Sequence, residues 1–306
     1  MRTSRGARGA VMVVLLGLGL LLGLAGPPGA LAQGTGWACA GPEPATAPEG
    51  EASPETAAAT AGPIAFPAEG GELTVFAAAS LTDAFTAIEV DLEAANPGLK
   101  ITYNFAGSQT LVTQMTEGAT ADVFASANLA QMMAAVEAGL IAGEPEMFVS
   151  NRLAIVVPSD NPAGLTSAAG LATDGLRLVL AQAEVPVGVY ARQAICLMGH
   201  DSAGYGEDFV ARVAANVVSE EDDVREVLTK VQLGEADAGI VYVSDAAVAG
   251  DAVRLIEIPD LVNVLATYPI APVVGGDPGL SAAFIGYLLG RDGQDTLAAY
   301  GFGPVP

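Results

Sequence analysis

Two serines that follow strand-like runs are the residues of this chain best suited to bind an anion. Ser80 comes after the predicted strand 73–77 and two further alanines, and a helix-like pattern begins directly behind it. We expect Ser80 to be the N-cap of that helix, with Asp83 completing an approximate capping box. A helix N-terminus offers free backbone N–H groups and a positive dipole end, and small alanines let a ligand come close. On this segment alone, a helix cap without a ligand is the favoured interpretation, and the rest of the chain reverses this.

Ser108 repeats this arrangement at the next junction between a strand and a helix. It lies 28 residues after Ser80, which is close to the length of one βαβ unit of about 30 residues. Neighbouring parallel strands would place both serines at the same carboxyl edge of a sheet, where open α/β folds bind their ligands. The sequence therefore predicts two hydroxyl groups at one sheet edge.

Three residues further along the chain could face these serines from the other side of a cleft. Val187 lies in a turn that opens a helix, Val224 lies at the start of another helix, and Tyr242 ends an apolar strand. Helix starts supply backbone N–H donors, and tyrosine supplies a hydroxyl group. Each residue also has a simpler interpretation, because valines usually belong to the core and a strand tyrosine is often half-buried. The joint order and spacing favour the binding site.

The chain offers little that could catalyse a reaction. Its single histidine, His200, is followed by Asp201 and Ser202, but adjacent residues do not converge on one point as a catalytic triad must. The acidic run 220–223 could attract a cation, and we interpret it instead as the acidic first turn of a helix. The sequence lacks the phosphate-loop and dinucleotide-binding patterns, so we expect no cofactor, no enzyme activity and no direct metal cation ligands.

Strand-like and helix-like segments alternate from residue 72 onward, which is typical of a largely parallel sheet covered by helices. The chain is thus predicted to be an α/β protein. We expect strands at 73–77, 101–105, 123–125, 153–157, 177–180 and 238–242, and helices at 81–94, 109–117, 129–138, 190–198, 205–213, 222–232 and 279–289.

Two apolar segments, 151–158 and 268–274, could carry the chain between two α/β lobes and back. With these crossings we expect lobe 1 at residues 72–153, lobe 2 at 154–266, and a return to lobe 1 at 267–306. The ligand cleft would then lie between the lobes.

The N-terminus reads as a signal for export. Residues 1–32 combine three arginines, an apolar run and an Ala-Leu-Ala cleavage site, as a secretory signal peptide does, whereas the apolar run is too short for a membrane span. Residues 33–71 are rich in Pro, Ala, Glu and Gly and predict a disordered linker. We expect an exported protein, periplasmic or on the outer face of the cytoplasmic membrane.

The charge and the cysteine content indicate which binding partners and which kind of membrane anchoring are possible. The formal net charge of −23 argues against nucleic acid as a partner, and any anion site must therefore rely on local dipoles. The two cysteines, Cys39 and Cys196, could form a disulfide in an oxidising compartment. Cys39 could instead carry a lipid anchor, and the sequence leaves both possibilities open.

Taken together, the motifs make the chain similar to the periplasmic molybdate-binding proteins of ABC transporters, which are type-2 solute-binding proteins. The resemblance covers residues 72–304. Its motifs are the segments 74–81, 105–111, 121–127, 185–191, 221–225 and 239–245, in that order.

The resemblance implies a type-2 periplasmic-binding-protein fold with two lobes and a role for each matched residue. Ser80 and Ser108 would donate hydroxyl and backbone N–H groups to an oxyanion, Val187 and Val224 would donate backbone N–H groups, and Tyr242 would donate its hydroxyl. Molybdenum would thus be held as an oxyanion. The family often has alanine at the position of Val187, so the larger side chain could reshape the pocket.

The implied function is the capture of molybdate or tungstate and its delivery to a membrane permease of an ABC transporter, by a protein that we expect to be a monomer. One alternative is a binding protein for sulfate or another small oxyanion. Another is an exported α/β hydrolase that uses Ser80 or Ser108, which would need His200 as its base.

Overall fold

The computed structural model describes Trp37, Cys39 and residues 66–200, 205–206 and 208–306. The predicted signal peptide and most of the predicted linker lie outside the described residues, as do Asp201 and Ser202. Among the described residues, no helix has the length and apolar character needed to cross a membrane.

Within the described part of the chain, nine strands form a mixed sheet in the order β2-β1-β3-β9-β4-β7-β5-β6, with β8 paired to β4. The pairs β1–β2, β1–β3, β5–β6 and β5–β7 are parallel, and the pairs that involve β4 or β9 are antiparallel. The strands are β1 (Gly71–Ala78), β2 (Leu99–Ala106), β3 (Val123–Ala125), β4 (Glu146–Pro158), β5 (Leu178–Ala181), β6 (Val217–Glu221), β7 (Ala238–Tyr242), β8 (Val253–Glu257) and β9 (Leu265–Pro272).

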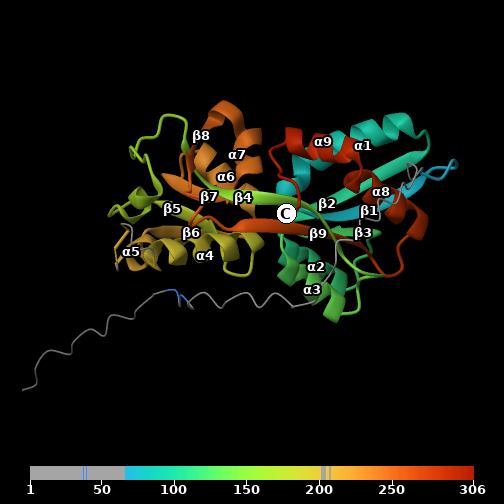
Figure 1. The fold of residues 1–306 in the computed structure, drawn as a ribbon, viewed down its shortest axis with the longest axis horizontal. Helices are drawn as coiled ribbons and strands as arrows, with labels where there is room; N and C mark the ends of the chain where they lie inside the picture. Colours follow the sequence, from blue (N-terminus) through green and yellow to red (C-terminus); the bar gives the residue numbers. More distant parts are fainter. Residues whose placement is uncertain (1–36, 38, 40–65, 201–204, 207) are drawn as a thin grey trace, which may run out of the picture. The chain divides into compact units, whose positions relative to one another are not determined.

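The long strand β4 joins the two halves of this sheet. Its first part, up to Arg152, pairs with β9, and its second part, from Leu153, pairs with β7 and β8. In Figure 1, β4 and β9 run through the middle of the fold between two groups of helices. We use lobe 1 and lobe 2 for the predicted spans 72–153 with 267–306, and 154–266.

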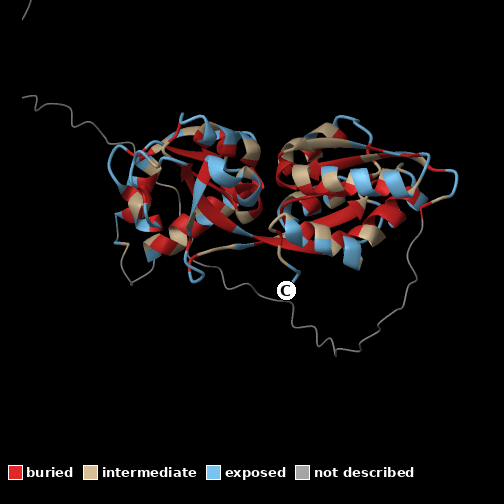
Figure 2. Ribbon diagram, turned by 90° about the horizontal axis from the view of Figure 1, so that it is seen from above, coloured by how far each residue is buried: buried red, intermediate tan, exposed pale blue. Residues whose placement is uncertain are grey.

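Helices cover both faces of each half of the sheet, so the central strands are buried on both sides (Figure 1). They are α1 (Thr82–Ala95), α2 (Ser108–Thr116), α3 (Leu129–Glu137), α4 (Pro186–His200), α5 (Phe209–Ala215), α6 (Val224–Gln232), α7 (Val243–Ala249), α8 (Pro278–Leu289) and α9 (Arg291–Ala299). Three short 3-10 helices are η1 (Ala79–Leu81), η2 (Ala168–Ala172) and η3 (Gly250–Ala252). Figure 2 shows the buried strands in red and the outward helix faces in pale blue.

Strand β7 shows how the sequence suits a strand that helices cover on both faces of the sheet. All five of its residues are buried, and Gly239 lies under α6, where a Cβ atom would approach Val227 Cγ1 to 2.9 Å. Glycine therefore lets α6 pack closely on the strand that ends at Tyr242. This packing fixes the tyrosine relative to the start of α6.

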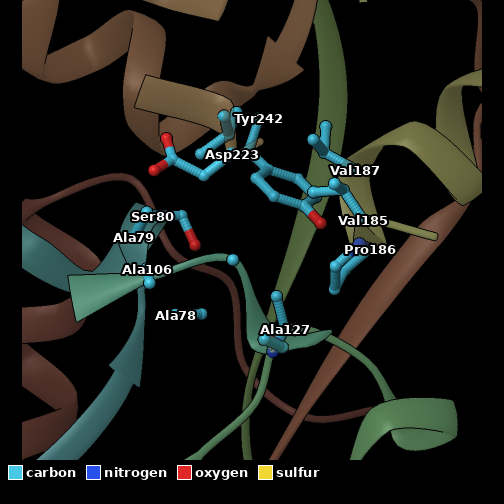
Figure 3. Close-up of a pocket in the computed structure, with 13 residues that line it drawn as sticks. Ala78, Ala79, Ser80, Ala106, Ala127, Val185, Pro186, Val187, Asp223 and Tyr242 are labelled. Carbon is cyan, nitrogen blue, oxygen red and sulfur yellow. Dashed lines mark hydrogen bonds between the residues drawn. The ribbon is translucent and has the colours of Figure 1, made fainter. Parts of the chain in front are cut away.

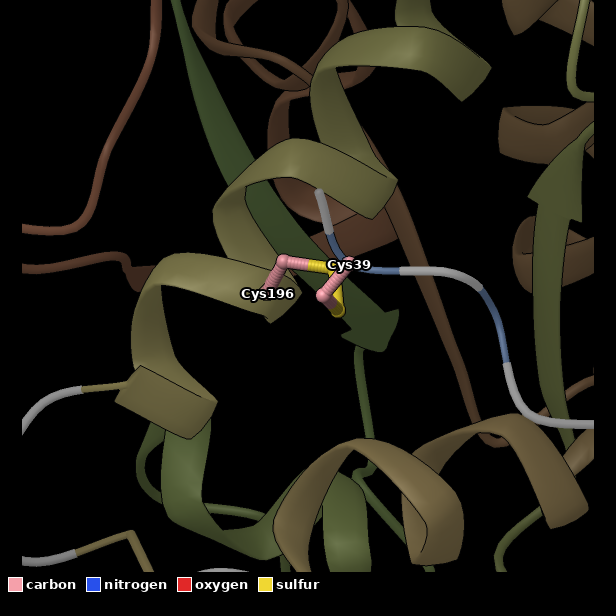
Figure 4. The surroundings of a disulfide bond; sticks show 2 residues. All are labelled: Cys39 and Cys196. Atoms are coloured by element: carbon pink, nitrogen blue, oxygen red, sulfur yellow. A yellow bond between two sulfur atoms is a disulfide. The ribbon is translucent and has the colours of Figure 1, made fainter. Parts of the chain in front are cut away.

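A disulfide ties the N-terminal segment to lobe 2 (Figure 4). Cys39 pairs with Cys196 in α4, with a Cα–Cα distance of 5.5 Å and a sequence separation of 157. Trp37 packs beside it, with the guanidinium carbon of Arg192 5.3 Å from the centre of its ring. The structure thus favours pairing over the alternative of a lipid on Cys39.

Candidate anion-binding site

A small cavity lies where the carboxyl ends of β1, β2 and β7 meet the starts of α2, α4 and α6 (Figure 3). Its volume is about 10 Å³, close to the roughly 10–15 Å³ that a single water molecule needs, so the space is very small. All five residues that the sequence singles out line it, and each is 4% exposed or less. The full lining is Ala78, Ala79, Ser80, Ala106, Gly107, Ser108, Ala127, Val185, Pro186, Val187, Asp223, Val224 and Tyr242.

Ser80 lies in the cavity wall, but the prediction that it caps α1 is wrong. The chain first makes the 3-10 turn η1, so the N-cap position falls to Leu81, which makes no side-chain capping bond. The Ser80 hydroxyl lies 3.0 Å from the hydroxyl of Tyr268. Asp83 pairs with Arg225 instead of completing a capping box. The hydroxyl of Ser80 is therefore turned toward the cavity region and away from the helix backbone (Figure 3).

Ser108 is the first residue of α2, behind the N-cap Gly107. Its Oγ accepts a hydrogen bond from the N–H of Ala127 at 3.0 Å, so its own proton can be donated elsewhere. Gly107 is required here, because a Cβ atom would lie 2.6 Å from the carbonyl oxygen of Asp222 in lobe 2. Glycine thus allows the two lobes to approach each other beside the cavity.

The opposite wall contains the first turns of α4 and α6. Pro186 begins α4, a position where proline loses no helical hydrogen bond, and Val187 follows it. Asp223 is the N-cap of α6, and its Oδ1 accepts from the N–H groups of Arg225 and Glu226 at 2.7 and 3.1 Å. The capping bonds leave out the N–H of Val224, which as the first residue of α6 has no acceptor within the helix.

The acidic run 220–223 is not the first turn of a helix, contrary to the sequence interpretation. Glu220 and Glu221 end β6 and pair with Arg192 and Lys230. Only Asp223 caps α6, and in Figure 3 its carboxylate points away from the cavity. Among the residues that the structure describes, no group of acidic, histidine and cysteine side chains could hold a metal ion.

Tyr242 presents a buried hydroxyl that has no hydrogen-bond partner among the described residues. Burial, together with the nearby phenol of Tyr268, raises the pKa of Tyr242 well above its ordinary value. The phenol therefore stays protonated and can act as a donor. In Figure 3 its oxygen points into the cavity, beside Val187 and Pro186.

The cavity combines donors from both lobes without a cation in its wall. No lysine or arginine occurs among the described lining residues, and the nearby Arg225 is paired with Asp83 and Asp245. The N-termini of α2, α4 and α6, which are the positive ends of the helix dipoles, lie at the cavity. Hydroxyl and N–H donors around a small, buried space can bind a small anion.

Sequence reasoning missed several residues that support the site, notably Tyr268, Asp245 and Arg225. A tyrosine within an apolar strand signals a buried hydroxyl that needs a partner, which would have drawn attention to Tyr268. His200, the base that a hydrolase would need, is the exposed last residue of α4 and does not line the cavity.

The chain forms two α/β halves with a small cavity between them, which is the two-lobe binding-protein fold, and solved structures agree on this fold. The alignment with the sulfate-binding protein SubI from Mycobacterium tuberculosis H37Rv covers 76% of this chain and 87% of the SubI chain, with a TM-score of 0.69 and 19% identity. The periplasmic molybdate-binding protein of Azotobacter vinelandii matches 76% of this chain and 99% of its own with a TM-score of 0.63 and 16% identity.

Sequence comparison gives the family. The model of the bacterial extracellular solute-binding proteins matches residues 73–303. The molybdate-binding protein ModA of Mycobacterium tuberculosis H37Rv is 39% identical over 231 residues, which cover 75% of this chain and 84% of that relative. The chain therefore belongs to the bacterial extracellular solute-binding proteins and, within them, to the group that contains the ModA proteins.

Proposed function

We propose that this protein captures molybdate, or tungstate, outside the cytoplasm and delivers it to the permease of an ABC transporter. The observation that supports this best is the buried, unpartnered hydroxyl of Tyr242, which faces a cavity that Ser80 and Ser108 line from the other lobe. The name of the related ModA protein supports molybdate as the ligand.

The proposed roles follow from the chemistry of a tetrahedral dianion. Its four oxygens accept hydrogen bonds from all directions, and each such bond to a charged group is worth about 1.5–3 kcal/mol net. Ser80 and Ser108 would supply hydroxyl and N–H donors, Val187 and Val224 N–H donors, and Tyr242 its hydroxyl. Fixed neutral donors suit a chain whose formal net charge is −23.

Binding to both lobes would favour the closed state over an open one, and a permease could sense loading in this way. We propose a monomeric binding protein without enzyme activity. The family description, bacterial extracellular solute-binding protein, supports a binding role over an enzymatic one.

Sulfate is the second candidate ligand, because SubI shares the fold. A thermal-shift series with molybdate, tungstate, sulfate and phosphate separates the two. A ligand that binds only the folded state stabilises it by about 2.7 kcal/mol at 100 times its Kd, so the correct anion must raise the melting temperature by several degrees. We expect molybdate and tungstate to do so at concentrations where sulfate and phosphate have no effect. A shift with sulfate and none with molybdate would reject the proposal.

We further propose that Cys39 is a structural cysteine of an exported protein and carries no lipid, since a sulfur in a disulfide cannot also form a thioether. The pairing with Cys196 and the packing of Trp37 against Arg192 support this.

Intact mass spectrometry of the protein purified from its own envelope tests this prediction. We expect a chain without a lipid whose mass rises by two hydrogens on reduction, and whose Cys39 becomes open to alkylation in Cys196→Ser. A diacylglycerol adduct on Cys39, or free thiols before reduction, would contradict it.

A further inference from the structure

One arginine joins the two lobes beside the cavity. Arg225, the second residue of α6 in lobe 2, places its Nη2 2.6 Å from Oδ2 of Asp83 in lobe 1 and its Nε 2.9 Å from Oδ1 of Asp245 in α7. The same Nη2 lies 3.4 Å from the carbonyl oxygen of Ser80. A single guanidinium group thus contacts carboxylates of both lobes.

The two ion pairs differ in burial. Asp245 is fully buried, whereas the side chain of Asp83 is 35% exposed and that of Arg225 is 23% exposed. Burial raises the pKa of Asp245 to about 6, and the guanidinium of Arg225 opposes this rise, so the carboxylate is ionised at neutral pH. The pair within lobe 2 is therefore a fixed part of that lobe. The pair with Asp83 depends on the lobes being closed.

Arg225 is also connected to three of the five proposed binding residues. It follows Val224 directly, and it lies next to the carbonyl of Ser80. The second oxygen of Asp245 accepts a hydrogen bond from the N–H of Tyr242 at 3.1 Å. Closing the pair with Asp83 therefore brings donors of both lobes into one arrangement.

We propose that Arg225 is a positioning residue whose ion pair with Asp83 latches the lobes in the closed state, while Asp245 holds the guanidinium ready for it. This deepens the proposed function and rests on it for the ligand. Beside the cavity, amide-to-carbonyl bonds from Gln109 to Asp222 and from Gln131 to Glu184 also join the lobes, at 3.0 and 3.3 Å. Further contacts lie along the connecting strand β4, where Asn151 donates to Ser244 and Arg152 pairs with Asp260. The latch adds a charged contact on the cavity side, and it does so without placing a cation in the cavity.

Asp83→Asn is the variant that tests the latch, because it breaks the pair across the lobes and leaves Arg225 paired with Asp245. Asp91→Asn is the matched control, since Asp91 lies on the same helix, is exposed, and loses the same charge. Replacing Arg225 itself would leave the Asp245 carboxylate buried without a cation, which destabilises a protein for unrelated reasons.

The readouts are the dissociation constant and dissociation rate of molybdate and the radius of gyration of the ligand-free protein in solution scattering. For a partly exposed pair we expect Asp83→Asn to bind about three- to tenfold more weakly, through faster dissociation. We also expect it to scatter as a more open particle than Asp91→Asn, with a similar melting temperature.

Asp83→Glu should recover part of the affinity that Asp83→Asn loses. The difference between Asp83→Asn and wild type should shrink as salt rises, because salt screens exposed charges.

Equal binding, equal dissociation rates and equal radii in Asp83→Asn and Asp91→Asn would overturn the latch. If the wild-type protein binds no molybdate, the proposed function fails and the scattering comparison alone decides. In that case a larger radius for ligand-free Asp83→Asn still supports the latch, and an equal radius rejects it.

Discussion

Val224→Pro is expected to lose at least about a hundredfold in oxyanion affinity while the protein stays folded. Val224 is the first residue of α6, where proline is tolerated because that N–H has no helical partner. The preceding Asp223 has φ −155° and ψ 176°, the extended conformation that a residue before proline prefers. The substitution therefore removes one proposed donor and sets the proline Cδ in its place, and it leaves the helix intact.

Val224→Ala is the control, because it shortens the side chain and keeps the N–H. Calorimetric titration of both variants with molybdate measures the effect, and circular dichroism checks that α6 is retained. We expect the alanine variant to bind within a few-fold of wild type. If the folded proline variant bound as tightly as the alanine variant, the backbone of Val224 would not be a donor to the ligand.

Tyr242→Phe is expected to change binding and stability in opposite directions. Without ligand, the hydroxyl of Tyr242 is buried and unpartnered, and removing such a group costs nothing or stabilises the fold. With ligand, the variant lacks a hydrogen bond to a charged group, so affinity should fall by about 10- to 100-fold. Denaturant unfolding with and without molybdate measures both effects in one experiment.

Tyr268→Phe is the matched control, since Tyr268 is also buried and its ring centre lies 5.8 Å from that of Tyr242. Its hydroxyl is bonded to Ser80, so its loss should destabilise the ligand-free protein by about 1 kcal/mol. A Tyr242→Phe variant that is less stable without ligand and binds normally would show that its hydroxyl serves the fold and not the ligand.

Local patterns were sufficient to predict the parts of the site that depend on short stretches of chain. Ser108 follows a strand and starts a helix, Tyr242 ends a buried strand, and Val224 begins a helix, as their neighbours in sequence indicate. Ser80 lies at the predicted sheet edge, although a 3-10 turn replaces its capping role. That turn depends on how β1 enters α1, which a capping pattern does not describe.

Long-range contacts were beyond these patterns. The pairing of Arg225 with Asp83 joins residues 142 positions apart, and nothing in either segment marks them as partners. The same holds for Ser80 and Tyr268.

The edge strands β6 and β8 were missed because their alternating polar residues give a weak signal, and α7 was missed because it follows Tyr242 without a connecting loop.

Anomalous diffraction from crystals grown with tungstate tests the proposed binding site, because the heavy atom marks its own position. We predict one strong anomalous peak per chain inside the cavity, with oxygens within hydrogen-bond distance of the hydroxyls of Ser80, Ser108 and Tyr242 and the N–H groups of Val187 and Val224. If the cavity shows no peak in crystals that contain tungstate, or if the tungstate peak lies elsewhere on the chain, these residues do not form the oxyanion site.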